Sequence, residues 1–113
     1  MDCIFCKILK GEIPSKKVYE NDMVYAFHDI NPVAPVHVIV IPKEHITSVN
    51  DINSSSSEYV KCIFEAIPEI ANQLGVKEDG YRVITNIGEN GGQSVKHLHF
   101  HIIGGTKLGE KLV

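Results

Sequence analysis

Three histidines alternate with apolar residues near the end of the chain, in the run HLHFHII over residues 97–103. Successive side chains of a β-strand point to opposite faces, so this alternation predicts a strand over 97–103. The histidines would share one face, with neighbouring rings about 6–7 Å apart, and the apolar residues would face a core. The chain is therefore expected to bury one side of a sheet and to present three imidazoles on the other.

The remaining pattern predicts an α+β fold with a mainly antiparallel sheet. A short helix is expected over 4–9. A long helix is expected to begin at a capping box formed by Ser55 and Glu58 and to end at Gly75. Pro68 lies inside that helix and predicts a kink between 64 and 68. Further strands are expected over 18–19, 23–29, 36–41 and 81–87.

Length and composition narrow the class of protein. A chain of 113 residues predicts one domain spanning 1–113. Eleven basic and fourteen acidic residues give a net charge of −3, which argues against a protein that mainly binds a nucleic-acid backbone. Apolar runs such as VIVI at 38–41 are too short to span a membrane, so neither a membrane-spanning segment nor a secretory leader is expected. Three cysteines, an odd number, favour a reducing, cytoplasmic location.

Taken alone, the three histidines allow three interpretations. They could lie on a solvated face without chemistry, form an open zinc site, or include a nucleophile whose second ring nitrogen bonds a backbone carbonyl. The preceding glycine-rich loop, GENGGQSV at 88–95, favours the nucleophile. Backbone N–H groups in such a loop can bind phosphate oxygens, and Ser94 adds a hydroxyl.

These segments resemble the histidine-triad (HIT) family, and in particular its nucleoside-phosphoramidase (Hint-type) branch. The resemblance rests on the histidine run, on AFHDI at 26–30, on PVHVIVIPK at 35–43, on Asn86 and on GGQS at 91–94. It implies a HIT-like fold, with a five-stranded antiparallel sheet, one long helix and one short helix. It also implies a homodimer in which the sheet continues from one subunit into the other.

The resemblance also implies an activity. Members of the branch bind purine nucleoside monophosphates. The expected reaction is hydrolysis of the P–N bond of nucleoside 5′-phosphoramidates, typified by AMP bearing an amine, through a nucleotidyl-histidine. AMP is the expected nucleotide and GMP is left open, whereas no nucleic-acid or membrane partner is expected. Two alternatives remain, a nucleotide-binding sensor or scaffold with little turnover and a zinc-dependent phosphohydrolase.

Residue roles follow from the same resemblance. His99 would attack the α-phosphorus, and His101 would hydrogen-bond a phosphate oxygen. Ser94 would lie near the leaving amine, and His37 would support the catalytic face from the neighbouring strand. The nucleotide-binding candidates are Ile4, Phe5, Ile8 and Ile30 at the base, Asp29 at the ribose, and Asn86, Gly92, Gln93, Ser94, Val95, His99 and His101 around the phosphate.

Two cysteines, Cys3 and Cys6, open the chain at a spacing common among zinc ligands. Two further ligands would complete a tetrahedral site, and His45 and His97 are the candidates. In similar HIT proteins with this N-terminal pair, zinc is held at the four corresponding positions. We therefore expect a structural zinc and no catalytic metal, the alternative being a pair of reduced thiols. The third cysteine, Cys62, lies beside the apolar stripe of the expected long helix and is expected to be a partly buried packing residue without chemistry.

Overall fold

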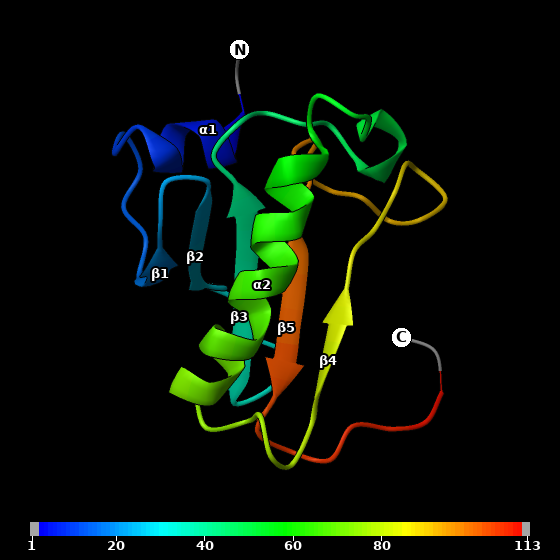
Figure 1. The fold of residues 1–113 in the computed structure, drawn as a ribbon. Helices are drawn as coiled ribbons and strands as arrows, with labels where there is room; N and C mark the ends of the chain where they lie inside the picture. The colour runs from blue at the N-terminus through cyan, green and yellow to red at the C-terminus, as the bar shows by residue number, and fades with distance from the viewer. Residues whose placement is uncertain (1–2, 112–113) are drawn as a thin grey trace.

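The computed structural model describes residues 3–111, so the two residues at each end of the predicted domain lie outside the described range. An open five-stranded sheet forms its centre, in the order β1-β2-β3-β5-β4 (Figure 1). Every neighbouring pair of strands is antiparallel. The strands are β1 (Lys17–Glu20), β2 (Val24–His28), β3 (Val36–Pro42), β4 (Tyr81–Ile84) and β5 (Phe100–Gly104). The predicted α+β class and antiparallel sheet are confirmed.

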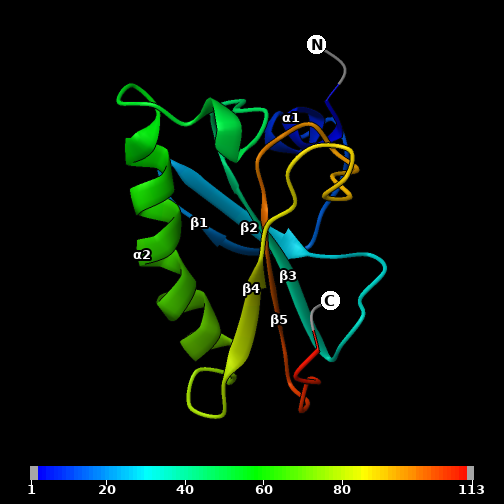
Figure 2. The ribbon, with the colours of Figure 1, turned by 90° about the vertical axis from the view of Figure 1, so that its right-hand side faces the viewer.

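Two α-helices accompany the sheet, α1 (Ile4–Leu9) and α2 (Ser57–Gln73), with a short 3-10 turn at Val49–Asp51. Helix α2 covers one face of the sheet, and the short helix α1 lies on the opposite side (Figure 2). The helix α2 runs through Pro68 and stops before Gly75, whose φ of 76° is left-handed and suits glycine. The expected end of the long helix is therefore confirmed. No helix within residues 3–111 is long and apolar enough to cross a membrane.

Strand β3 is buried on both faces, which explains its nearly unbroken apolar sequence. Val38 and Val40 belong to the main core, which also contains the inward residues of α2. Ile39 and Ile41 belong to a second cluster on the opposite face, where Phe5 of α1 packs. The strand therefore joins the core beneath α2 to the smaller cluster beneath α1.

The predicted strand over 97–103 is too long, because regular pairing begins only at Phe100. Continuing the β3–β5 register would bring Leu98 opposite Pro42, and proline has no N–H to donate to a ladder. The backbone N–H of Leu98 instead bonds the carbonyl of Ile46. The alternation of faces nevertheless persists, since Leu98, Phe100 and Ile102 all lie in the main core.

The predicted capping box at the start of the long helix is wrong. Helix α2 begins at Ser57 with Ser56 as its N-cap residue, and no side chain caps its first turn. The hydroxyl of Ser56 accepts instead from the backbone N–H of Asn53, at 3.0 Å. Ser55 donates its own N–H to the Asn53 side chain, at 2.8 Å. A tight turn centred on Asn53 thus occupies the Ser55 N–H that the capping box would have needed.

Burial beneath α2 predicts the cost of truncating this core. Ile70 is fully buried in the main cluster, so Ile70→Ala should lower the free energy of unfolding by about 2–5 kcal/mol through lost contacts and an unfilled cavity. The matched control on the same helix is Glu65→Ala, an exposed position expected to change stability by less than about 0.5 kcal/mol. Urea unfolding followed by circular dichroism measures both. Equal effects of the two variants would contradict the assigned core.

Candidate active site

Neighbouring strands bring His37 and His101 together on the sheet face opposite α2. In the antiparallel β3–β5 pair, His101 lies opposite Ile39, and His37 is two residues away on the same face of β3. Nε2 of His37 lies 2.9 Å from Nδ1 of His101, which is hydrogen-bond distance. The carboxylate of Asp29, which follows β2, lies 3.3 Å from the same Nε2 atom. The structure therefore brings three predicted site residues together: His37 and His101 within hydrogen-bond distance of each other, and Asp29 beside His37.

The ring of His99 is held by a backbone group. Its Nδ1 lies 2.7 Å from the carbonyl oxygen of His97. Because a carbonyl only accepts, Nδ1 must carry the proton, and Nε2 keeps its lone pair. Phe5 contacts the ring edge-on, with centroids 5.1 Å apart. Among residues 3–111 every fully buried side-chain nitrogen or oxygen has a partner, so the unbonded Nε2 must reach solvent. This arrangement is suited to nucleophilic attack.

Burial keeps the site histidines neutral. Desolvation is the main cause that lowers the pKa of His99 below its usual value near 6.5, against the opposing bond to the His97 carbonyl. Desolvation also lowers the pKa of His101 to about 4, helped by the nearby His99 and His37 rings and opposed by Asp29. Near neutral pH, both rings are therefore uncharged, and His99 can offer a lone pair to an electrophile.

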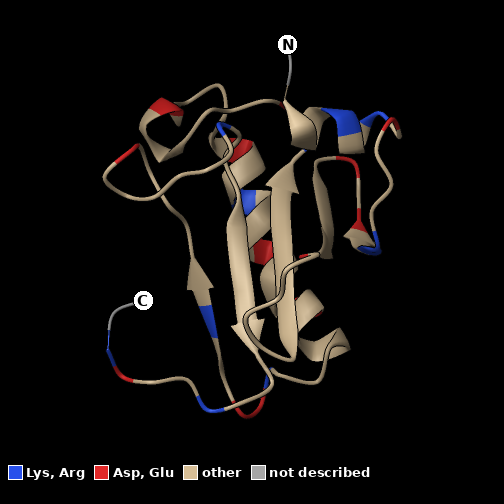
Figure 3. Ribbon diagram, turned by 180° about the vertical axis from the view of Figure 1, so that it is seen from behind, with Lys and Arg blue, Asp and Glu red and all other residues tan. Residues whose placement is uncertain are grey.

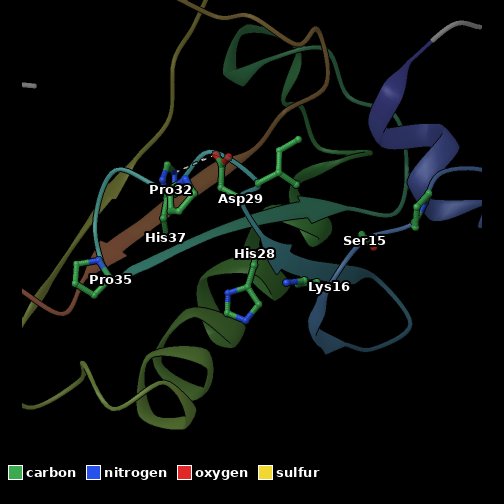
Figure 4. Close-up of a pocket in the computed structure, with 9 residues that line it drawn as sticks. Ser15, Lys16, His28, Asp29, Pro32, Pro35 and His37 are labelled. Atoms are coloured by element: carbon green, nitrogen blue, oxygen red, sulfur yellow. Dashed lines mark ion pairs between the residues drawn. The ribbon is translucent and has the colours of Figure 1, made fainter.

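A cavity of about 740 Å³ opens beside Asp29 and His37 (Figure 4). Ile30 lines it while remaining 90% exposed at its rim. Sequence reasoning missed most of the other lining residues, which are Pro14, Ser15, Lys16, His28, Pro32 and Pro35. The signal for His28 was its position at the exposed end of β2, directly before Asp29. Lys16 comes from the segment before β1 and carries no comparable signal.

The glycine-rich loop is held together by Gln93, which is 7% exposed. Its side-chain oxygen accepts from the Gly88 N–H at 3.0 Å, and its side-chain nitrogen donates to the carbonyls of Thr47 and Val95. Its backbone N–H also donates within the loop, to the carbonyl of Gly88. The geometry therefore disfavours the predicted nucleotide contact of the Gln93 side chain, because its oxygen and nitrogen are already hydrogen-bonded within the protein. The residue positions the loop.

Two other predicted phosphate contacts are also used inside the loop. The Gly92 N–H donates to the carbonyl of Glu89, and the Asn86 side chain donates to the carbonyl of Gly91 at 2.7 Å. The backbone N–H groups of Ser94 and Val95 bond no acceptor in the described part of the chain. The groups available for an anion are thus fewer than the glycine content implied, and they lie at the end of the loop.

A second cavity, of about 490 Å³, lies beside the end of this loop. Ser94, Val95 and Ile4 line it, together with Thr47 and Lys96. Of the residues predicted to enclose the base, Ile4 lines this cavity and Ile30 lines the larger one. Phe5 is buried in the second core cluster, with Ile8 packed against it, and its ring contacts His99.

Four predicted metal ligands converge in one cluster. The candidate atoms of Cys3, Cys6, His45 and His97 all lie within 4.8 Å of one another. Nδ1 of His97 is 3.3 Å from the Cys3 sulfur and 3.6 Å from the Cys6 sulfur, and Nδ1 of His45 is 3.3 Å from the Cys6 sulfur. Sulfur and nitrogen ligands of a tetrahedral zinc stand about 3.6 Å apart. The donor set and its spacing therefore fit zinc.

A backbone group also orients the His97 ligand. Nε2 of His97 lies 3.1 Å from the Pro42 carbonyl, so this nitrogen carries the proton and Nδ1 presents its lone pair to the sulfurs. The group of Asp29, His37 and His101 meets the same proximity criterion for a metal. Its nitrogens, however, approach to 2.9 Å, closer than the about 3.3 Å that two tetrahedral zinc ligands require. That group is better described as hydrogen-bonded.

Comparison with known proteins identifies the family to which this fold belongs. The HIT domain model matches residues 10–108. A purine nucleoside phosphoramidase of Escherichia coli K12 is 44% identical over 111 residues, which cover 98% of this chain and 93% of that protein. A histidine triad protein from Clostridium difficile is 54% identical with a TM-score of 0.94, covering 99% of this chain and 97% of that one.

A further solved structure, of a HIT family hydrolase from Clostridium thermocellum, is 50% identical with a TM-score of 0.96. The match covers 99% of this chain and 97% of that one. The family match spans most of the chain, and these relatives are similar over nearly their whole length. The chain therefore belongs to the HIT domain family.

Proposed function

We propose that the protein is a nucleoside 5′-monophosphoramidase, a hydrolase that cleaves the P–N bond of purine nucleoside phosphoramidates. The observation that carries the proposal is the His99 ring, with Nδ1 bonded to the His97 carbonyl and Nε2 open to solvent. The names of the Escherichia coli phosphoramidase and the Clostridium thermocellum hydrolase support the same reaction class. AMP bearing an amine on phosphorus is the proposed substrate type, with GMP derivatives as a second option.

Each part of the site has a role in the proposed reaction. The Asp29 carboxylate lines the larger cavity and accepts hydrogen bonds from ribose hydroxyls. The free N–H groups of Ser94 and Val95 and the ring of His101 bind phosphate oxygens, and they stabilise the charge that develops there. The leaving amine then departs toward the smaller cavity, which Ser94 lines.

The chemistry occurs in two displacements. Nε2 of His99 attacks the α-phosphorus and the P–N bond breaks. The leaving nitrogen takes up a proton that reaches it from solvent through the Ser94 hydroxyl at the cavity wall. Water then attacks the phosphorus of the nucleotidyl-His99 and loses a proton to solvent, which breaks the bond to Nε2, releases the nucleoside monophosphate and restores the free ring. The His97 carbonyl holds the ring in one orientation throughout.

The proposed zinc is structural. His97 turns its Nδ1 toward the cysteines, so the three histidines do not converge on one ion, which argues against a three-histidine zinc hydrolase. A zinc bound by Cys3, Cys6, His45 and His97 would tie α1 to the segment before β5 and supply cross-linking rather than catalysis. Free thiols at the described cysteines fit the proposed cytoplasmic location.

The proposed assembly is a homodimer in which the sheet continues through the β4 edge. Strand β4 lies at the end of the sheet, and an edge strand presents unpaired backbone groups. Val83 on β4 is a large exposed hydrophobic residue, and so is Phe64 on α2, which contacts Phe100 of β5. Nucleic acids and membranes are not among the proposed partners.

The first prediction about function concerns the nucleophile. His99→Ala should lower kcat/KM for a fluorogenic adenosine phosphoramidate by at least about 1,000-fold, because no other ring replaces Nε2, while AMP binding persists. Glu65→Ala on the far side of α2 is the control and should match wild type. Activity surviving in His99→Ala would refute the mechanism. A wild-type protein that binds AMP without turnover would instead favour the sensor alternative.

The second prediction concerns the metal. Cys3→Ser with Cys6→Ser should abolish a zinc content of about one per chain and lower the unfolding midpoint by about 5–10 °C, since the cross-link is lost. Cys62→Ser is the matched control and should leave zinc bound, because its sulfur bonds Met23 and Glu58 rather than any of the four ligand residues. Metal analysis and calorimetry measure these effects. Activity that falls in proportion to zinc at unchanged stability would show a catalytic metal instead.

A further inference from the structure

We infer that the backbone N–H of Val33 sets the proton positions of the His37–His101 pair and thereby makes His101 a hydrogen-bond donor toward the active site. Val33 is then a positioning residue that acts through its main chain. The assignment of a phosphate oxygen as the acceptor rests on the proposed function. The proton positions themselves rest only on hydrogen-bond geometry.

The first step is the state of His37. The backbone nitrogen of Val33 lies 3.1 Å from Nδ1 of His37. A backbone N–H can only donate, so Nδ1 must accept and carries no proton. A neutral ring then has its proton on Nε2. A doubly protonated ring is disfavoured, because it would direct a second N–H at the N–H of Val33.

The second step passes this choice to His101. Nε2 of His37 carries a proton and faces Nδ1 of His101 at 2.9 Å. This Nδ1 must accept, so the proton of a neutral His101 lies on Nε2. The Asp29 carboxylate lies 3.3 Å from the same Nε2 of His37, and its negative charge favours a proton on that nitrogen. One backbone N–H thus decides the proton position two rings away.

The third step is what the open nitrogen of His101 offers. Nε2 of His101 bonds no group in residues 3–111, and it is not sealed from solvent. The ring lies 5.1 Å, between centroids, from that of His99. His99 has the opposite tautomer, with Nε2 bare, because the His97 carbonyl fixes its Nδ1 proton. His99, just before β5, and His101, in β5, thus present a lone pair and an N–H side by side, the pair that attack on a phosphorus with charged oxygens requires.

The loop between β2 and β3 is built to hold this N–H in place. The Asp29 N–H donates to the His37 carbonyl at 2.9 Å, and the Asp29 side chain accepts from the Asn31 N–H at 2.8 Å. The Val33 side chain is 72% exposed, so packing of that side chain does not explain its position. Figure 4 shows Asp29 and Pro32 of this loop gathered over His37. The contact that Val33 makes with the site is its main-chain hydrogen bond.

Nitrogen NMR of histidine-labelled protein tests the assignment directly. Two-bond correlations between ring nitrogens and ring protons distinguish a protonated from a bare nitrogen, and single histidine variants assign each ring. At pH 7.5 we expect the proton on Nε2 of His37, on Nε2 of His101 and on Nδ1 of His99. A proton on Nδ1 of His101 would overturn the inference. Added AMP should shift Nε2 of His101, and an unchanged signal on saturation with AMP would overturn its role toward phosphate.

Removing the single N–H tests the cause. Replacing Val33 with its α-hydroxy analogue changes one amide to an ester, which deletes the N–H and keeps the side chain, and Val33→Pro is the genetically simpler variant. The ester should give His101 mixed tautomers and lower kcat by about tenfold, less than full loss of an oxyanion donor, with KM nearly unchanged. Val33→Ala keeps the N–H and should match wild type in both readouts.

The outcomes separate this inference from the proposed function. Unchanged tautomers in the ester would overturn the role of Val33, whatever the activity. Wild-type protein with the expected tautomers and an AMP-induced shift, but without turnover of the phosphoramidate, would refute the hydrolase while supporting the donor assignment. Equal loss of activity in Val33→Ala and the ester would show that the side chain matters, and would overturn the main-chain argument.

Discussion

The pairing of β3 with β5 is the constraint on which both the core and the site depend. Its register places His37 and His101 on one face and Val38 and Ile102 on the other, beneath α2. Neither strand contains a Lys, Arg, Asp or Glu residue, and both appear uncharged from the open side of the sheet (Figure 3). A slip of one residue would turn the histidines into the core and the aliphatic side chains out. The burial of the aliphatic side chains that stabilises the fold therefore also fixes the face on which His37 and His101 lie.

Much of this architecture could be predicted from the sequence, because the spacing of apolar residues shows which face of a strand or helix packs against the core. The alternation in residues 97–103 identified which side chains enter the main core, and the end of α2 before Gly75 followed from the conformational freedom of glycine. The errors came from groups that a local pattern does not contain. Pro42, 56 residues before Leu98 in the chain, limits the ladder, and the Asn53 turn occupies the serines that would have capped α2. Element boundaries are decided by such non-local or competing bonds.

The site shows the same division. The histidines and Asp29 of the candidate site were named individually from the sequence, and the four predicted metal ligands do lie together. The loop residues were harder, because a glutamine that binds a ligand and one that braces its own loop look alike in a sequence. Gln93 braces the loop. Main-chain contributions were invisible in the same way, since the N–H of Val33 and the carbonyl of His97 belong to any residue type. Only the folded backbone reveals which of them face a ring.

The irregular stretch before β5 has a consequence for how such a catalyst can be altered. Strand β4 ends at Ile84, and regular pairing of β5 starts at Phe100, so the carbonyls of residues 97 and 99 lie outside the ladder. The His99 carbonyl accepts from the Thr85 hydroxyl, and the His97 carbonyl accepts from the His99 ring, the proposed nucleophile. A redesign that extended β5 back through residues 97–99 as regular β-structure would remove the His97 carbonyl as the acceptor that orients the His99 ring. The proposed nucleophile therefore depends on a backbone carbonyl that lies outside the regular sheet.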